Sequence, residues 1–447
     1  MTNLVTARLI IIVFSCLFLA LERTTLIEDL SVWPHTIALF GVVHLMRLEY
    51  RNCPAHTLAI FYQSFYFTGM LLSAVLITAG LPMIEIGEVG TANGTFWALV
   101  IFLVCGTAAS SMGFRVKLPL DSGRRRLGAI LERRFVIGLT VAVVATSILV
   151  LLLFSNPYSL GMDRVVYWDT VVPGHLSWVN SAVRQTVLFP ILLFYMSESG
   201  SSQRRLASGL IAAYLVITVV MLGEKASAFI LYSAIWLLVL GAYRGRFGFD
   251  RRMLILLVGG LGSIYALLSY NYGVAEYGDA FIITRIAMQA QVLWSVLNSF
   301  DFPFFSQVAS ECFWGCDAAS GPADYVSLRY LPSYLYAIYS ESGSTLSGFL
   351  PGLAILSFGF FGALILHILV SFVLGFIASR LLDQFRRHNL LYSFLLFKVY
   401  FAMILYWYAA IHTAVHSLIF FLTIALVVVI FVVGGNRKRR ISSPHQA

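Results

Sequence analysis

The strongest constraint on the fold is a series of apolar runs, each near or above the length of a bilayer span, that recurs from one end of the chain to the other. A helix needs about 20 apolar residues to cross the hydrocarbon core. The runs are continuous rather than alternating between apolar and polar residues, which excludes a membrane β-barrel. Only 11% of the 447 residues are charged and 59% are hydrophobic, and a soluble domain of this size does not have that composition. The sequence therefore predicts an all-α polytopic membrane protein.

The apolar runs predict twelve membrane spans in one integral membrane domain, residues 1–447. These spans cover residues 4–21, 33–46, 56–82, 95–114, 135–154, 182–197, 207–222, 227–243, 253–269, 349–378, 391–411 and 415–434. Inner connections of membrane proteins are rich in Lys and Arg. With the N-terminus inside, the inner connections hold 23 of the 30 basic residues, and the outer ones hold 6 basic and 15 acidic residues. Both termini are thus expected to be cytoplasmic, and the net charge of +9 to reflect topology rather than nucleic-acid binding.

Two long outer connections are the places where chemistry is expected. They cover residues 155–181 and 270–348, and long ordered loops in compact proteins are usually functional. Apolar residues recur at helical spacing in residues 278–300, which predicts an amphipathic helix lying at the membrane surface. The longest inner connection, residues 115–134, is too short for a nucleotide-binding domain. No nucleotide and no other cofactor is therefore expected.

Six basic residues lie on the outer side, against the orientation rule. They are Arg23, Arg164, Arg184, Lys225, Arg285 and Arg329. Each could pair with an outer acid or touch a lipid headgroup, and we prefer such a pairing for Arg23, which follows Glu22. The other five could instead converge into a basic pocket at the outer boundary of the membrane. Arg binds phosphate oxygens in a bidentate manner and Lys acts as a point charge, so the implied ligand is an anionic lipid, such as a pyrophosphate on a long isoprenoid chain.

The stretch VVMLGEKASAFILY, residues 219–232, is predicted to be a recessed turn. Only 38 residues separate Arg205 from Arg244, although two full spans need about 40. Glu224 and Lys225 should therefore lie below the outer surface, where a charge usually faces a cavity or a partner. Either the two charges neutralise each other or they face a ligand.

Aromatic, cysteine and histidine residues leave alternatives open. Trp294, Tyr336 and Tyr339 in the second outer loop could stack on sugar rings, or belong to an interfacial aromatic belt. Cys312 and Cys316 could form a disulfide or remain two thiols. The pair His412 and His416 has no carboxylate nearby in the sequence, so no metal site is predicted.

The chain resembles the O-antigen polymerases of the Wzy type in its twelve spans, its inner termini and its two dominant outer loops. GEKASAF looks like the short Gly-x-Lys turn of that family, and DAFIITRIAMQAQVLWSVLNSF is similar to its Arg-led amphipathic segment. YSESGSTLSGFLPGLAILSFGFFGAL, residues 339–364, looks like the family's entry into the following span. The resemblance implies a fold like that of the membrane-embedded, GT-C-like glycosyltransferases.

The resemblance also implies a reaction at the periplasmic face of the bacterial inner membrane. A growing glycan on undecaprenyl pyrophosphate would be transferred to a second undecaprenyl-pyrophosphate-linked repeat unit, without metal or nucleotide. Membrane lipids and a chain-length regulator are further possible partners. Arg164, Arg285 and Lys225, and after them Arg184 and Arg329, are expected to hold the pyrophosphate. The candidate general bases are Glu224 and Glu341, with His175 next.

Two other functions remain open. An O-antigen ligase also uses outer arginines, together with a histidine in its large loop, but residues 270–348 contain no histidine. A flippase or transporter for lipid-linked oligosaccharides usually has duplicated helical bundles, and the chain has no repeat that we can align.

Overall fold

The structure is a computed structural model, and its helices agree with the all-α prediction. It describes residues 2–23, 32–52, 56–116, 126–157, 159–162, 166–186, 189, 201–220, 289–299, 322–342, 346, 351–387, 390–405 and 425. Five of the described helices are long and apolar enough to cross a membrane. An all-α membrane protein is thus confirmed as the class. Twelve spans and their orientation stay a prediction.

The chain divides into two compact units. The first contains residues 1–116, 277–379 and 400–420, and the second contains residues 117–276, 380–399 and 421–447. The described elements of the first unit are α1 (Thr2–Arg23), α2 (Val32–Asn52), α3 (Thr57–Thr78), β1 (Pro82–Met83), β2 (Glu88–Val89), α4 (Thr95–Arg115), α13 (Gln291–Ser299), α14 (Pro322–Tyr330), α15 (Ser333–Ser342) and most of α16 (Gly352–Arg386). Helix α17 (Leu390–Leu405) begins in the second unit and ends in the first.

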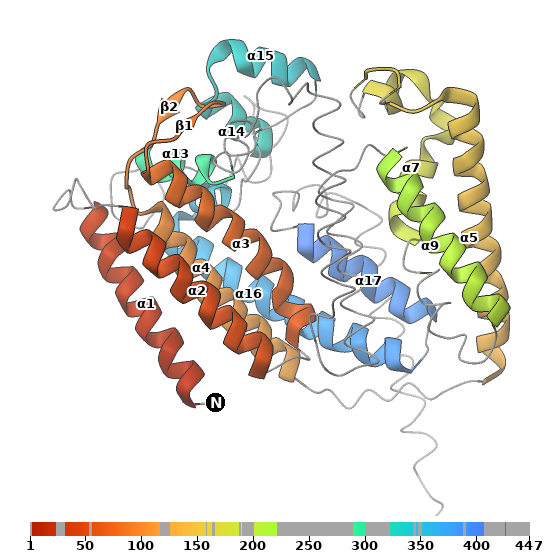
Figure 1. The fold of residues 1–447 in the computed structure, drawn as a ribbon, viewed down its shortest axis with the longest axis horizontal. Helices are drawn as coiled ribbons and strands as arrows, with labels where there is room; N and C mark the ends of the chain where they lie inside the picture. The colour runs from red at the N-terminus through yellow and green to blue at the C-terminus, as the bar shows by residue number, and fades with distance from the viewer. Residues whose placement is uncertain are drawn as a thin grey trace, which may run out of the picture. The chain divides into compact units, whose positions relative to one another are not determined.

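Helix α4 is the central helix of the first unit, and 16 of its 21 residues are buried. It packs against α1, α3 and α13 (Figure 1). By contrast, α1 and α2 turn large apolar side chains outward, such as Val13, which is 65% exposed, and Phe40, which is 70% exposed. Apolar side chains exposed along such helices fit contact with lipid.

Glycines bring α4 and α16 into close contact. A Cβ at Gly113 would overlap the carbonyl oxygen of Phe372, and one at Gly375 would overlap that of Ser110. Small residues allow this approach of two backbones, which is the usual way in which membrane helices pack without a hydrophobic driving force. Ser110 reinforces the contact by donating to the carbonyl of Ser371 at 2.8 Å. Helix α16 also kinks at Gly359, whose φ of 70° is left-handed.

A buried ion pair fastens one end of the first unit. Arg8 of α1 pairs with Glu49 of α2, and Ser111 of α4 donates to the same carboxylate at 2.8 Å. Three helices meet there because a buried carboxylate must be hydrogen-bonded. We call this the basic end of the unit, since Arg47, Arg51 and Arg115 also lie at it.

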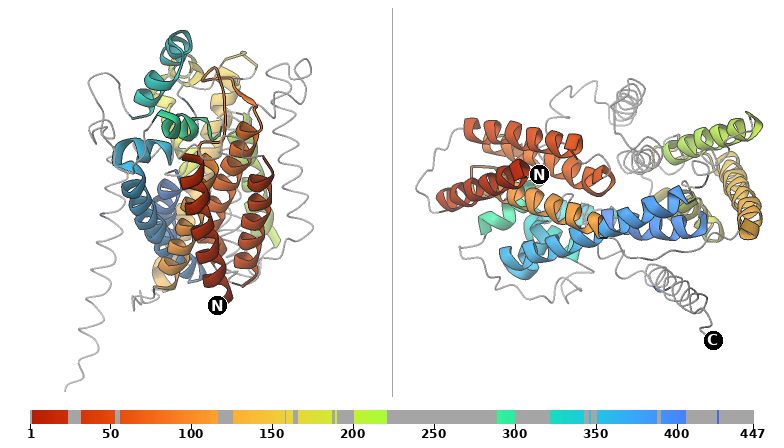
Figure 2. Two further views of the ribbon diagram at one scale, coloured as in Figure 1. Left: turned by 90° about the vertical axis from the view of Figure 1, so that its left-hand side faces the viewer. Right: turned by 90° about the horizontal axis from the view of Figure 1, so that it is seen from below.

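The opposite end of the first unit is covered by the β-hairpin and by α13, α14 and α15. Figures 1 and 2 show these elements beyond the ends of α1–α4 that lie away from the N-terminus. The hairpin follows α3, pairs Pro82 with Val89, and turns at Gly87, whose φ is 78°. We call these four elements the cap, and this end the capped end.

Helix α13 lies within residues 278–300, where the sequence predicts an amphipathic helix. Its residues 291–297 are all buried. That it lies at a membrane surface stays a prediction. Apolar residues at helical spacing predict a helix with one buried face, and the cap covers the second face as well.

The second unit contains α5 (Arg126–Phe154), α7 (Trp178–Thr186) and α9 (Ser201–Val220). Helix α5 packs against both of the others, and the hydroxyls of Thr186 and Tyr214 lie 2.6 Å apart between α7 and α9. Helix α5 begins at Arg126, inside the stretch expected to be a basic loop. A π-helical turn, Tyr167–Val171, and a 3-10 turn, Gly174–Leu176, precede α7.

We expect Gly375→Ala to destabilise the protein by about 1–3 kcal/mol or more, because the added Cβ meets backbone that cannot rotate away. Thermal unfolding in detergent measures the effect. The control is Gly41→Ala in α2, where the new Cβ has no neighbour within 4 Å. Equal melting temperatures for the two variants would contradict the close contact of α4 and α16.

Candidate functional site

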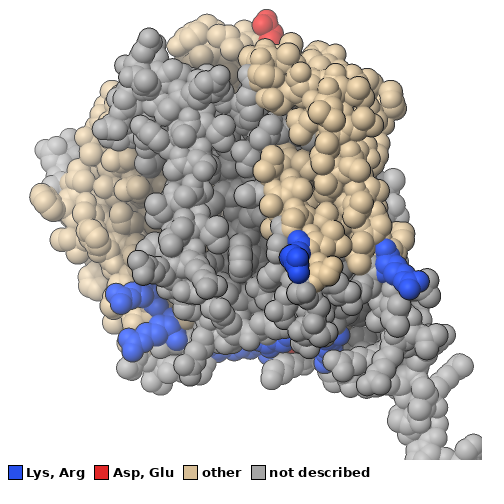
Figure 3. All heavy atoms as spheres, turned by 45° about the vertical axis from the view of Figure 1, so that its right-hand side comes forward, with Lys and Arg blue, Asp and Glu red and all other residues tan. Residues whose placement is uncertain are grey.

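The two ends of the first unit differ in charge. Among the described side chains of this unit, the basic end has four basic residues and one acid, and the capped end has two basic residues and five acids. The capped-end residues are Glu22, Arg23, Glu85, Glu88, Asp324, Arg329 and Glu341. Figure 3 marks the described Lys and Arg side chains in blue and the described acidic ones in red on one face of the molecule. Because basic residues mark the inner side, this difference supports placing the capped end outside.

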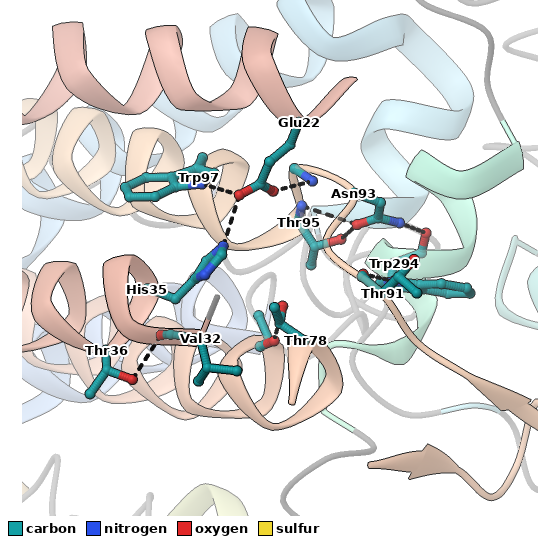
Figure 4. A network of polar contacts seen from close by, with 12 residues as sticks. Glu22, Val32, His35, Thr36, Thr78, Thr91, Asn93, Thr95, Trp97 and Trp294 are labelled. Atoms are coloured by element: carbon teal, nitrogen blue, oxygen red, sulfur yellow. Dashed lines mark hydrogen bonds and ion pairs between the residues drawn. The ribbon is translucent and has the colours of Figure 1, made fainter. Parts of the chain in front are cut away.

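Glu22 joins three helices at the capped end (Figure 4). Its buried carboxylate accepts hydrogen bonds from His35 Nε2 at 2.9 Å and from Trp97 Nε1 at 2.7 Å. The backbone N–H of Gly94 adds a third bond at 2.8 Å. Gly94 has a φ of 89°, and a Cβ there would overlap Leu19. We call Glu22, His35, Trp97 and Gly94 the Glu22 clasp.

The hydrogen bonds of the clasp define the tautomer of His35. With its proton on Nε2, His35 donates to Glu22, and Nδ1 needs no donor partner. Among the described atoms Nδ1 has no partner, so a proton placed there would be a buried, unpaired donor. The hydrogen bond to Glu22 therefore favours the tautomer of His35 that carries its proton on Nε2.

Reciprocal hydrogen bonds fasten α13 to the chain that leads into α4. Asn93 donates to the carbonyl of Trp294 at 2.9 Å, and Trp294 Nε1 donates to the carbonyl of Thr91 at 2.8 Å. Arg23 donates to the carbonyl of Leu297, and Ser73 accepts from the N–H of Ala290 at 2.9 Å. Residues that are 201 to 274 positions apart in the sequence thus fix α13 against α1, α3 and α4.

A second buried carboxylate, Glu85, connects three parts of the cap. It lies in the turn of the hairpin and is 7% exposed. Gln291 of α13 donates to its Oε2, and the hydroxyl of Tyr339 in α15 donates to its Oε1 at 2.6 Å. The hairpin, α13 and α15 are therefore held around one negative charge.

Arg329 is an exposed cation held among tyrosines on α14. Its Cζ lies 5.8 Å from the centroid of the Tyr330 ring. Burial acts to lower the pKa of Arg329, but interactions with the hydroxyls of Tyr330 and Tyr325 outweigh it and raise the pKa. Tyr330 is positioned in turn by the hydroxyl of Ser299, 3.0 Å away. The guanidinium is thus oriented before any ligand arrives.

The cap brings together five of the residues predicted for the site. These are Trp294, Arg329, Tyr336, Tyr339 and Glu341. Trp294 is only 4% exposed and its N–H is bonded, so the structure supports a packing role for it. Tyr336 and Tyr339 are partly exposed, and Glu341 is exposed. Their roles toward a glycan stay predictions.

The other predicted residues lie elsewhere. His175 is exposed in the 3-10 turn of the second unit, and Arg184 lies on α7, where only its backbone is described. Arg164, Glu224, Lys225 and Arg285 lie outside the described residues, as do Cys312, Cys316, His412 and His416. Within the described ranges, no three side chains of the metal-binding kind gather.

The two buried carboxylates of the capped end were not predicted from the sequence. Glu22 was expected to accompany Arg23, but adjacent residues of a helix point apart, and Glu22 bonds to His35 and Trp97 instead. The sequence around Glu85 contains no motif that predicts a buried carboxylate. The position of Glu22 at the end of an apolar run could have predicted a buried contact, because a charge there is usually paired with a group on a neighbouring helix.

Comparison with known proteins gives one partial match. A family of unknown function (DUF6418) matches residues 323–409, which include α14, α15, α16 and α17. No curated protein and no solved structure matches the chain.

We expect Glu22→Ala to reduce stability strongly, because it leaves three buried donors unpaired at a cost of about 1–3 kcal/mol each. The matched control is Glu88→Ala, which removes an exposed carboxylate at the same end and should change stability by less than about 0.5 kcal/mol. Thermal unfolding in detergent compares the two. Similar losses in both variants would show that the clasp does not stabilise the bundle.

Proposed function

We propose that the protein is a membrane-embedded glycan polymerase of the O-antigen polymerase type. It transfers a growing glycan from undecaprenyl pyrophosphate to the sugar of a second undecaprenyl-pyrophosphate-linked repeat unit. The reaction takes place at the periplasmic face of the bacterial inner membrane and uses no nucleotide. The proposal combines the sequence resemblance with the position and charge of the cap.

The observation that supports this function best is the oriented Arg329 on a folded cap above membrane-spanning helices. Only one other basic side chain, Arg23, lies among the described residues at the capped end of the first unit, and it is bonded to a backbone carbonyl. Arg329 is exposed and held by Tyr325 and Tyr330. A preoriented guanidinium suits the bidentate binding of phosphate oxygens.

The position of the cap fits a lipid-linked substrate. Its helices are short and lie at the ends of helices long enough to span a bilayer, so a ligand bound there can keep an isoprenoid chain in the membrane. Its tyrosines present aromatic faces and hydroxyls together, which suits both the boundary of a membrane and a sugar ring.

The proposed chemistry is a displacement at the anomeric carbon of the donor sugar. The hydroxyl of the acceptor sugar forms the new bond to this carbon, and the pyrophosphate leaves with the electron pair of the bond that breaks. Positive side chains stabilise the charge that develops on the leaving group. In our proposal Arg329 contributes to this.

Arg329→Ala tests the proposal. We expect the purified variant to extend a lipid-linked repeat unit at least about 10-fold more slowly than the wild type, because an oriented charge on the leaving group is lost. Arg329→Lys should recover only part of the rate, since Lys lacks the planar fork. Chain length on gels and the initial rate of extension are the measurements.

The matched control is Arg51→Ala, which removes an exposed arginine from the basic end of the same unit. It should extend the repeat unit at the rate of the wild type. A wild-type protein that extends no lipid-linked repeat unit would overturn the polymerase. In cells, loss of a polymerase leaves a single repeat on the lipid core, and a bare core after deletion would identify a ligase instead.

A further inference from the structure

Glu85 is a buried carboxylate that reaches the surface of the cap through one side chain. The carboxylate is 7% exposed, whereas Tyr339, which donates to its Oε1 at 2.6 Å, is partly exposed. Tyr339 thus lies between a buried base and the solvent.

Gln291 donates a second hydrogen bond to this carboxylate. Its side chain is buried, with 0% exposure, and its amide N–H₂ faces Glu85 Oε2. The opposite orientation of the amide would place its carbonyl against the carboxylate, which is repulsive. Glu85 therefore accepts from two donors at once.

We infer that Tyr339 and Glu85 form the acid–base pair of the transfer reaction, with Tyr339 touching the acceptor hydroxyl and Glu85 storing its proton. The inference rests on the proposed function. It adds a pair that includes Glu85, which was not among the predicted bases, and gives Tyr339 a role other than stacking on sugar.

The proton steps balance. As the acceptor oxygen bonds to the anomeric carbon, its O–H bond breaks and the proton passes to the oxygen of Tyr339. The original phenolic proton of Tyr339 moves to Glu85 Oε1, along the hydrogen bond already present. The negative charge that Glu85 loses appears on the departing pyrophosphate, and Glu85 later returns its proton to water.

The pair also lies on the right elements. Helices α14 and α15 are joined by Leu331 and Pro332. The cation proposed for the leaving group, Arg329, and the hydroxyl proposed for the acceptor therefore belong to consecutive helices of the cap.

The other carboxylates of the cap suit this role less well. Glu88 and Glu341 are exposed, and water solvates a carboxylate there as in any surface position. Glu341 lies two positions after Tyr339, and residues two apart on a helix do not face each other. The charged side chains on the described elements around Glu85 are Glu88, Asp324, Arg329 and Glu341, and all of them are at least partly exposed.

Tyr339→Phe and Glu85→Gln test the inference with the full-length protein and a purified lipid-linked repeat unit. Each should lower kcat by about 100-fold, the lower end of the range for general acid–base catalysis, with KM for the acceptor within about 2-fold. The double variant should be no slower than the slower single variant, because the two residues act as one unit. Glu85→Gln should also lose the acidic limb of the pH profile of kcat, which Glu88→Gln retains.

The outcomes separate the two proposals. If the wild type extends the repeat unit and Tyr339→Phe keeps its kcat, the acid–base pair is wrong and the polymerase stands. If both single variants lose thermal stability but keep the wild-type pH profile and kcat per folded protein, Glu85 only fastens the cap. If the wild type extends nothing, the polymerase fails, and the pair fails with it.

Discussion

A carboxylate buried at the boundary of a membrane has to be hydrogen-bonded, and the first unit is organised by two such groups. Glu22 gathers α1, α2 and α4 at the capped end, and Glu49 gathers the same three helices at the basic end. An isolated charge in this environment is costly, so both contacts fix which helices are neighbours and in which register they lie. The charged contacts specify the arrangement of the helices, and the apolar contacts between the helices then stabilise it.

The cap depends on that arrangement. The N–H of Gly94 completes the Glu22 clasp, and the preceding Asn93 bonds to α13. The polar contacts of the bundle therefore continue directly into those of the cap. Within the cap, Glu85 is a further buried carboxylate that joins several elements through hydrogen bonds, namely the hairpin, α13 and α15.

The sequence predicted the regular parts of this structure well and its polar contacts poorly. Continuous apolar runs identified α1, α3 and α4 to within a few residues, because the length of a span is a local property. The contact between Glu22 and Trp97 joins residues 75 apart, and that between Glu85 and Tyr339 joins residues 254 apart. No local pattern reports such a pairing. The burial of α13 on both faces could not be predicted for a related reason, since the layer that covers its second face comes from other parts of the chain.

Three of the described hydrogen bonds that attach the cap are accepted by backbone carbonyls. Asn93, Trp294 and Arg23 donate to the carbonyls of Trp294, Thr91 and Leu297. Every residue type offers a carbonyl, so substitutions at positions 91 and 297 leave these acceptors in place. Attachment of the cap and the chemistry of its outer surface can therefore change independently. For the proposed polymerase this separation would be an advantage, because residues on the outer surface can change with the sugar substrate while the cap stays attached.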